Sequence, residues 1–212
     1  MGERSVDLVL FDLGGVLLEP GGVEPMRALA GIGSDEELWT RWLACPWVQS
    51  FESGACTPEE FASGLVAEWA LPLAPDDFLA RFATWPQGPF PGADALVERV
   101  HAVVPVAFLS NMNRCQWEAH YEGLALTGRF DYRFLSYELG LVKPDPRIFA
   151  AVAARLPVEP ARVLFLDDNA LNVEAGAGAG FVSRHVRGLA EVEQALAAVG
   201  LGGALGVGVV PG

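Results

Sequence analysis

Val9-Leu10-Phe11-Asp12-Leu13-Gly14-Gly15 is the stretch of sequence that decides the fold. It closes an apolar run over residues 6–11, interrupted only by Asp7, which predicts a strand buried on both faces, as in a parallel sheet. The run stops at a carboxylate, Asp12, and glycines follow shortly after it. On its own this arrangement could be only a turn after a strand. Its meaning depends on what the other predicted strands carry at their ends.

The rest of the chain alternates between apolar runs and helical stretches. The other runs lie at residues 106–109, 132–135, 163–166 and 181–186, and the helical stretches at residues 93–102, 114–122, 147–156, 170–179 and 189–199. Strands that alternate with helices in this way predict an α/β fold with a doubly wound, Rossmann-like parallel sheet.

Residues 18–90 break this alternation. Helices are predicted to begin at two capping-box patterns and at a third stretch, namely residues 34–37, 57–60 and 76–85. Because this all-helical insertion directly follows the first strand, we expect it to lie over the strand ends as a cap. The expected domains are a catalytic core of residues 1–17 and 91–212 and a helical cap of residues 18–90. Most of the tryptophans in the cap are expected to form its own core.

Length and composition restrict the possible functions. A chain of 212 residues suits one domain with an insertion, and 51% hydrophobic with 19% charged residues is typical of a well-packed globular protein. The net charge of −13 argues against nucleic acid and against anionic membrane surfaces as partners, because both are negatively charged. No apolar run approaches the length of a membrane span. The composition does not indicate an oligomeric state.

The cysteines and the first residues bear on the cellular compartment. Three scattered cysteines without a CxxC pair favour reduced thiols and give no zinc site. The chain reaches its first strand without the basic and apolar segments of a signal peptide. We therefore expect a cytoplasmic protein.

Polar residues stand at or shortly after the ends of four predicted strands. In chain order they are Asp12, Ser110 with Asn111, Lys143, and Asp167 with Asp168. Each group alone could be only a turn or a helix cap. An open parallel sheet, however, binds its ligands beyond the carboxyl ends of its strands. Taken together, in this order, these residues predict a single functional site at that edge.

Lys143 is the only lysine beside thirteen arginines. A composition so poor in lysine suggests that Lys143 marks a place where a guanidinium group will not serve. A compact ammonium can approach a phosphoryl oxygen as a point charge, whereas the planar fork of arginine needs more room. The alternative is a solvated loop lysine retained by chance.

Three carboxylates that lie close together cannot all stay ionised without a cation. Lys143 supplies one positive charge, and a Mg²⁺ ion bound by carboxylates, water and a substrate phosphate oxygen would supply the rest. Asp12 is then free to attack phosphorus and form an aspartyl-phosphate. Ser110, the backbone N–H of Asn111 and Lys143 would hold the phosphoryl oxygens.

Four segments resemble the motifs of the haloacid dehalogenase-like (HAD) hydrolase superfamily. They are residues 9–17 for motif I, 108–111 for motif II, 140–149 for motif III and 165–176 for motif IV. The likeness extends from residue 6 to about residue 199, and the helical insertion corresponds to the type-1 cap of that superfamily. Residues 110–114 and the Asp-Asp-Asn of residues 167–169 are most similar to the bacterial α-D-glucose-1-phosphate phosphatase group.

The resemblance implies a Mg²⁺-dependent phosphatase of a small phosphorylated metabolite, such as a sugar phosphate. It implies that Asp12, the carbonyl of Gly14 and Asp168 bind the metal, with Asp167 assisting. Asn172 would orient the motif IV carboxylates. Arg114 could reach the substrate or pair with an acidic surface residue, and the sequence leaves both open.

Gly14 departs from the pattern of most HAD phosphatases. They have an aspartate two residues after the nucleophile, and it protonates the leaving group. Gly14 can offer its carbonyl to a metal but donates no proton. A missing general acid costs about 10²–10⁴ in rate. The loss is smallest for groups that depart readily as anions, such as an anomeric sugar oxygen, an acyl group or nitrophenolate.

Two other functions remain open. Haloacid dehalogenases also lack the second aspartate and use the nucleophile on carbon without a metal. The adjacent Asp167 and Asp168 argue against that function, because without Mg²⁺ they would repel a carboxylate substrate. The third possibility is a catalytically weak protein that keeps only a phosphate-binding pocket.

Three further features are expected to be structural. Residues 176–180, Gly-Ala-Gly-Ala-Gly, follow a predicted helix instead of opening one, so they indicate close helix packing and a helix end. The histidines lack metal-ligand spacing. The glycine-rich, apolar tail of residues 200–212 is expected to be an extended segment on the surface.

Overall fold

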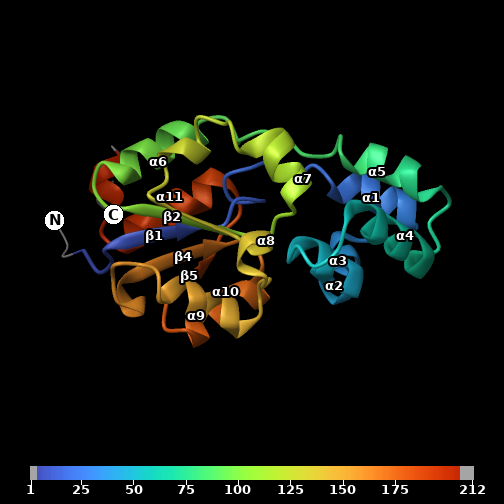
Figure 1. Ribbon diagram of the computed structural model, residues 1–212. Coiled ribbons are helices and arrows are strands. Elements are labelled where there is room, and N and C mark those ends of the chain that lie inside the picture. The colour runs from blue at the N-terminus through green and yellow to red at the C-terminus, as the bar shows by residue number, and fades with distance from the viewer. Residues whose placement is uncertain (1–3, 206–212) are drawn as a thin grey trace.

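The computed structural model describes residues 4–205, and a five-stranded parallel sheet forms its centre. The strands are β1 (Leu8–Phe11), β2 (Val106–Ser110), β3 (Tyr132–Leu135), β4 (Val163–Asp167) and β5 (Val182–His185). Their spatial order is β3-β2-β1-β4-β5, and every pair is parallel. This confirms the predicted doubly wound, Rossmann-like α/β fold (Figure 1).

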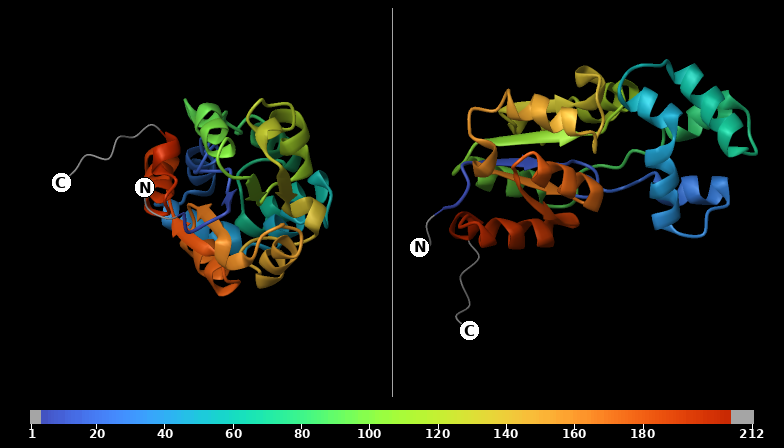
Figure 2. Two further views of the ribbon diagram at one scale, coloured as in Figure 1. Left: turned by 90° about the vertical axis from the view of Figure 1, so that its left-hand side faces the viewer. Right: turned by 90° about the horizontal axis from the view of Figure 1, so that it is seen from below.

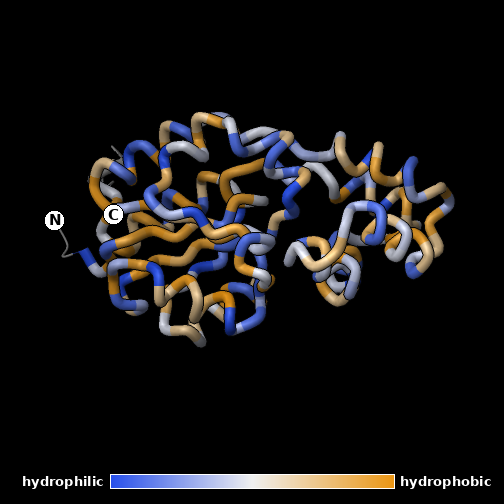
Figure 3. The backbone as a smooth tube through the Cα atoms, viewed as in Figure 1, coloured by the Kyte–Doolittle hydropathy of each residue, from blue (hydrophilic) through white to orange (hydrophobic). Residues whose placement is uncertain are grey.

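Alternate residues of the strands face two hydrophobic layers. Val9 and Phe11 pack into a cluster with α6 (Ala93–His101) and α11 (Gly188–Ala198). Leu8 and Leu10 pack into the opposite cluster, with helices α9 (Pro146–Ala153) and α10 (Ala170–Gly178). Figures 1 and 2 show these helix pairs on the two faces. In Figure 3 the strands between them are coloured mainly as hydrophobic residues. Burial on both faces explains why β1, β2 and β4 are largely apolar, whereas the edge strands β3 and β5 are partly exposed and carry polar residues.

Five helices connect β1 to β2. They are α1 (Val23–Ala30), α2 (Asp35–Ala44), α3 (Pro46–Glu52), α4 (Pro58–Trp69) and α5 (Pro75–Phe82). They lie beyond the carboxyl ends of the strands (Figure 1). Their hydrophobic cluster is separate from those of the sheet and spans Met26 to Trp85, inside the proposed limits of residues 18 and 90. It is rich in aromatic contacts, such as Phe51 stacked on Phe61 with ring centroids 4.3 Å apart.

The sequence predicted three of these five helices. Thr57 makes the complete capping box with Glu60, and Ser34 accepts a hydrogen bond from the backbone N–H of Glu37. The two missed helices, α1 and α3, follow the N-cap residues Gly22 and Cys45, and neither has a side-chain hydrogen bond that caps the helix. They are held by packing instead of by local signals. Trp69 and Trp85 are buried in the cluster, whereas Trp39 and Trp47 are exposed.

The helical insertion contacts the core at a short helix, α8 (Ser136–Leu139). The hydroxyl of Ser136 donates to the carbonyl oxygen of Glu52 at 2.5 Å and accepts from the backbone N–H of Met112 at 2.9 Å. Gly54 has a φ of +73° and packs against the carbonyl of Tyr137. One hydroxyl therefore links the end of α3 to the loop after β2.

Two segments differ from expectation. The helix predicted at residues 114–122 divides into α7 (Arg114–Gln116) and a π-helical turn, Trp117–Tyr121. The expectation of an extended tail is wrong for Gly202–Leu205, which forms a 3-10 helix. The chain turns at Gly200 and Leu201 donates its N–H to the carbonyl of Leu196, so this part folds back on α11. The rest of the tail lies outside the described residues.

Short 3-10 helices also occur at Thr127–Arg129 and Pro160–Arg162. Among the helices of the described chain, none combines the length and the apolar character that crossing a bilayer requires.

The glycine-rich stretch after β4 is a close packing site, as predicted. A Cβ on Gly176 would lie 2.6 Å from Cδ1 of the buried Phe165 and 2.9 Å from Oγ of Ser183. We expect Gly176→Ala to lower the free energy of unfolding by about 1–3 kcal/mol, the usual cost of overpacking. Gly178→Ala, in the same helix but with no atom within 4 Å of the new Cβ, is the control. It should leave stability unchanged or raise it by up to about 1 kcal/mol. Urea unfolding measures both, and equal destabilisation would contradict the packing argument.

Candidate active site

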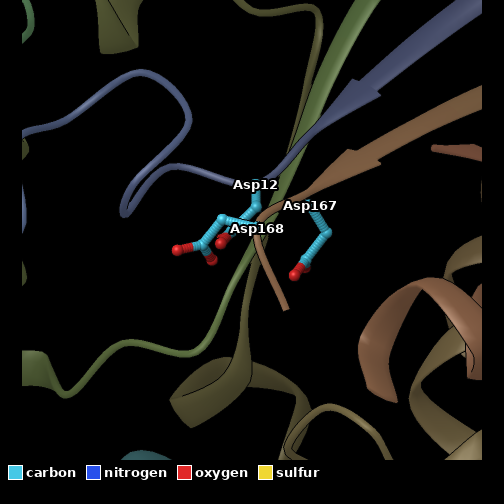
Figure 4. Close-up of side chains that lie close together, drawn as sticks. All are labelled: Asp12, Asp167 and Asp168. Carbon is cyan, nitrogen blue, oxygen red and sulfur yellow. The ribbon is translucent and has the colours of Figure 1, made fainter. Parts of the chain in front are cut away.

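The parallel register brings three carboxylates to one edge of the sheet. Phe11 pairs with Leu166, and the N–H of Asp12 donates to the carbonyl of Leu166 at 2.7 Å, so the ends of β1 and β4 coincide. Oxygens of Asp12, Asp167 and Asp168 lie within 4.8 Å of one another. Among the described residues no other group of three or more His, Cys, Asp and Glu side chains comes as close together. In Figure 4 the carboxylates of Asp12 and Asp168 lie side by side, whereas Asp167 points away from them.

Lys143 lies between two of these carboxylates. Its Nζ is 2.9 Å from Oδ1 of Asp12 and 2.6 Å from Oδ2 of Asp167, and it also donates to the carbonyl of Leu109 at 3.0 Å. Only 2% of the residue is exposed. The structure therefore contradicts the alternative of a solvated lysine. The ammonium joins the ends of β1, β2 and β4.

Asn111 holds Lys143 in this position. Its side-chain oxygen accepts from the N–H of Lys143 at 2.8 Å, and its side-chain nitrogen donates to the carbonyl of Lys143 at 2.9 Å. The amide thus clamps the loop that carries the lysine. The neighbouring Ser110 ends β2 and is buried at the same edge.

Asp167 accepts hydrogen bonds at both oxygens. Oδ1 accepts from the N–H of Asn169 at 2.9 Å and from Nδ2 of Asn172 at 3.0 Å. Oδ2 accepts from Lys143 and, at 3.1 Å, from Nδ2 of Asn172. A carboxylate offers about four lone-pair sites, so these bonds occupy Asp167 fully. Asp12 and Asp168 are the carboxylates better placed to hold a cation.

The glycines after Asp12 make room for Asp168. Gly15 has a φ of +70°, which favours glycine, and a Cβ there would meet the carboxylate of Asp168. Gly14 lies in open space, with no atom within 4 Å of an added Cβ. The first glycine is thus free to face a ligand, and the second lets the loop pass close to motif IV.

The site carries more negative than positive charge. Burial raises the pKa of Asp12 to about 8, and the nearby Asp167 and Asp168 add to this, while Lys143 opposes it. Burial and the charge of Asp167 raise the pKa of Asp168 to about 6. Burial alone would lower the pKa of Lys143, but the two adjacent carboxylates hold it above its ordinary value, so the lysine stays charged. One ammonium does not balance three carboxylates, and an all-oxygen site of this kind fits a hard divalent cation.

The sequence model of the haloacid dehalogenase-like hydrolase family matches residues 6–180 of the chain. The chain belongs to this family. It is therefore a HAD-like hydrolase, as the motifs predicted.

Curated relatives include several phosphatases. The chain is 30% identical over 190 residues to the bifunctional riboflavin kinase/FMN phosphatase of Arabidopsis thaliana, with 84% of this chain and 48% of that protein covered. It is 27% identical over 186 residues to the D-ribitol-5-phosphate phosphatase of Bacteroides thetaiotaomicron, covering 82% and 88%. The chain thus spans about half of the plant protein and most of the bacterial one.

Solved structures of this HAD family share the fold. A HAD-family enzyme of Bacteroides thetaiotaomicron has a TM-score of 0.68 at 24% identity, with 87% of this chain and 95% of that chain covered. The L-2-haloacid dehalogenase of Xanthobacter autotrophicus has a TM-score of 0.59 at 24% identity, covering 85% and 77%. Because these structures include a dehalogenase and an enzyme described only as a member of the HAD family, the fold does not identify the reaction.

Arg114 stands apart from the carboxylate cluster in this HAD-like chain. It pairs with Glu118 at 3.3 Å, and its guanidinium lies over the ring of Tyr137, with Cζ 4.9 Å from the centroid. The pairing with an acidic surface residue, one of the two roles left open by the sequence, is present. His185, which the sequence did not connect with the site, contacts the carbonyl of Asp168 at 2.8 Å. The position of His185 beside this site follows only from the strand register, in which His185 of β5 pairs with Asp167 of β4.

The contacts of Lys143 predict that arginine cannot replace it. We expect Lys143→Arg to reduce hydrolytic turnover at least about tenfold, because the planar guanidinium cannot occupy the position of the ammonium. Overpacking should also lower the free energy of unfolding by about 1–3 kcal/mol. Steady-state kinetics and urea unfolding measure the two effects. Arg155→Lys, an exposed exchange of the same pair of residue types, is the control and should behave as wild type. Wild-type behaviour of Lys143→Arg would contradict a role for ammonium geometry.

Proposed function

We propose that the protein is a Mg²⁺-dependent phosphatase of a small phosphorylated metabolite and works through an aspartyl-phosphate. The observation that carries this proposal is the buried cluster in which Lys143 contacts Asp12 beside Asp167 and Asp168. It provides a nucleophile, one fixed cation and a remaining negative charge that a divalent cation would balance. The phosphatases among the curated relatives support it.

Each residue has a role in this proposal. Asp12 is the nucleophile, and Asp12, the carbonyl of Gly14 and Asp168 would hold Mg²⁺. Asp167 assists by fixing Lys143, because its oxygens are already engaged. When bound, Mg²⁺ would balance the charge of the carboxylates and of the phosphoryl oxygens.

The phosphoryl group would be held at the same edge of the sheet. Ser110, the backbone N–H of Asn111 and Lys143 bind its oxygens, and Asn172 acts through Asp167. An oxygen of Asp12 attacks phosphorus, the bond to the leaving oxygen breaks, and water later hydrolyses the aspartyl-phosphate. Fixed donors at the strand ends stabilise the charge that develops on the phosphoryl oxygens.

The substrate is proposed only as a class. The helical insertion corresponds in this proposal to a type-1 cap, and a sugar phosphate, such as glucose 1-phosphate, is the candidate suggested by residues 110–114 and 167–169. The relatives named for D-ribitol 5-phosphate and FMN indicate that phosphate esters of hydroxylated compounds belong in the assay. The free thiols of Cys45, Cys56 and Cys115 are consistent with the proposed cytoplasmic location.

A dehalogenase is the second candidate. The (S)-2-haloacid dehalogenase of Pseudomonas fluorescens is 28% identical over 89 residues, which is 42% of this chain. Asp168 disfavours this candidate, because its carboxylate beside Asp12 would repel a haloacid unless a cation were bound. A weak phosphate binder is the third candidate.

The function is tested by product release. We expect phosphate release from p-nitrophenyl phosphate and from a panel of phosphorylated metabolites in the presence of Mg²⁺, and loss of this activity with EDTA. Recovery on adding Mg²⁺ back excludes unfolding as the cause. Halide release from 2-chloropropionate would favour the dehalogenase, and neither product would favour the binder.

The nucleophile is tested by an isosteric change. Asp12→Asn keeps the shape but removes the attacking charge, so turnover should fall to near background while the protein stays folded. Circular dichroism controls for folding. Glu68→Asn, an exposed change in α4, should retain activity. Appreciable phosphatase activity in Asp12→Asn would exclude Asp12 as the nucleophile.

A further inference from the structure

A cavity between the helical insertion and the core contains a carboxyl group that the mechanism above does not use. The cavity has a volume of about 150 Å³. Gln49 and Glu52 line it from α3, and Asn111, Lys143 and Asp145 line it from the core. It therefore borders two of the proposed phosphoryl-binding residues and receives Glu52 from the opposite side.

Glu52 is fixed at this boundary. Its backbone carbonyl accepts a hydrogen bond from the hydroxyl of Ser136, and that hydroxyl accepts one from Met112. The end of α3 is therefore attached beside the loop that follows β2. Its Oε1 accepts from Nε1 of Trp42 at 3.3 Å, which holds the half-buried carboxyl from the side of the insertion. The position depends on two separate anchors, one in the core and one in the insertion.

The environment of Glu52 favours the protonated acid near neutral pH. Burial raises its pKa to about 7, while the hydrogen bond from Trp42 and the charge of Lys143 oppose the shift. The charged or titratable groups on the elements around it are Lys143 and Asp145 in the cavity, Tyr137 and Glu138 on α8, Asp35, Glu36, Glu37 and Arg41 on α2 with Cys45 at its end, and Glu59, Glu60 and Glu68 on α4. A pKa of about 7 is close to the optimum for proton transfer at neutral pH.

We propose that Glu52 donates the proton to the leaving-group oxygen, and that the substrates are phosphate esters of aliphatic alcohols. The proposal rests on the phosphatase function proposed above. In this proposal Glu52 of the insertion takes over the role of the carboxyl group that is absent at Gly14 in motif I. Alkoxides are strongly basic leaving groups and need such a proton, whereas nitrophenolate does not.

The step balances in protons and bonds. An oxygen of Asp12 bonds to phosphorus as the bond from phosphorus to the leaving oxygen breaks. The leaving oxygen takes the proton of Glu52 and departs as a neutral alcohol, which leaves Glu52 as a carboxylate. Glu52 then accepts a proton from the water that attacks the aspartyl-phosphate, and Asp12 departs as a carboxylate.

The cavity also limits the alcohol. A volume of about 150 Å³ holds about five waters at ~30 Å³ each, which suits a small alcohol. The carboxylate of Asp145, which also lines the cavity, disfavours a second negative charge on the leaving group. An uncharged, hydroxylated aliphatic group fits both limits.

The test compares two leaving groups in one variant. Wild type and Glu52→Gln are assayed with glycerol 3-phosphate and with p-nitrophenyl phosphate at saturating Mg²⁺. We expect Glu52→Gln to lower kcat for glycerol 3-phosphate by about 10²–10⁴ and to change kcat for p-nitrophenyl phosphate less than about threefold. Retained aryl activity shows that the variant is folded. Glu68→Gln, the same change at an exposed site of the insertion, is the matched control and should match wild type with both esters.

The pH profile provides a readout that a structural role would not move. For glycerol 3-phosphate, kcat/KM of wild type should fall as the pH rises through about 7, because Glu52 must be protonated. This decline should be absent in Glu52→Gln. Trp42→Phe removes a bond that favours the carboxylate, so the pKa of Glu52 rises and the decline moves to higher pH.

A second variant uses the open space at Gly14. Gly14→Asp in the Glu52→Gln background should restore turnover of glycerol 3-phosphate at least about tenfold, since it supplies an acid from motif I. Equal losses with both esters in Glu52→Gln, or no loss with either, would overturn the proposal. So would a wild type that hydrolyses the aryl ester alone. A wild type without Mg²⁺-dependent activity on any ester would instead refute the phosphatase function.

Discussion

The buried contact of Lys143 with Asp12 and Asp167 is the interaction on which the site depends. It places one ammonium between the ends of strands that are far apart in the sequence, at 2.9 and 2.6 Å from two carboxylate oxygens. Removing one partner of a buried ion pair leaves an uncompensated charge, which usually costs about 3–5 kcal/mol. The other polar groups can be understood from this requirement. Asn111 clamps the backbone of Lys143, and Asn172 completes the hydrogen bonding of Asp167.

The parallel sheet is what makes this contact possible. With the order β3-β2-β1-β4-β5, the chain leaves β1 toward one side and returns through β4 on the other. The loops after these two strands diverge, and a crevice forms beyond their carboxyl ends. Asp12 and Asp168 lie there, and Gly15 allows the close approach of the two loops because it has no Cβ to meet Asp168. The fold therefore gathers carboxylates at the edge of the sheet, where a cation can bind both to them and to a phosphoryl group.

Much of the core could be predicted from the sequence, because strands buried on both faces leave long apolar runs and their polar ends mark one edge. The residues that meet there, Asp12, Ser110, Lys143 and Asp168, were found in this way. What local patterns could not give was the partner of each group. The saturation of Asp167 by four hydrogen bonds arises from side chains on different segments. Helices α1 and α3 lack capping side chains and are stabilised by the aromatic cluster. Glu52 was missed for the same reason, since its position depends on how α3 docks against α8.

Covalent phosphoryl transfer makes opposite demands on two carboxyl groups at the same pH. In the proposed mechanism, Asp12 must be ionised to attack, and the group that protonates the leaving oxygen must hold its proton. Burial is the largest cause of the raised pKa of both Asp12 and Glu52, so burial cannot separate them. A bound cation lowers the pKa of the carboxylates that it touches. Asp12 belongs to the core cluster that can hold such a cation, whereas Glu52 belongs to the insertion and lines a cavity with Asn111 and Lys143. Because the two carboxyl groups lie on different parts of the chain, a bound metal can lower the pKa of Asp12 while burial keeps the pKa of Glu52 raised. Different surroundings can thus make one carboxyl group the nucleophile and a chemically similar one the acid.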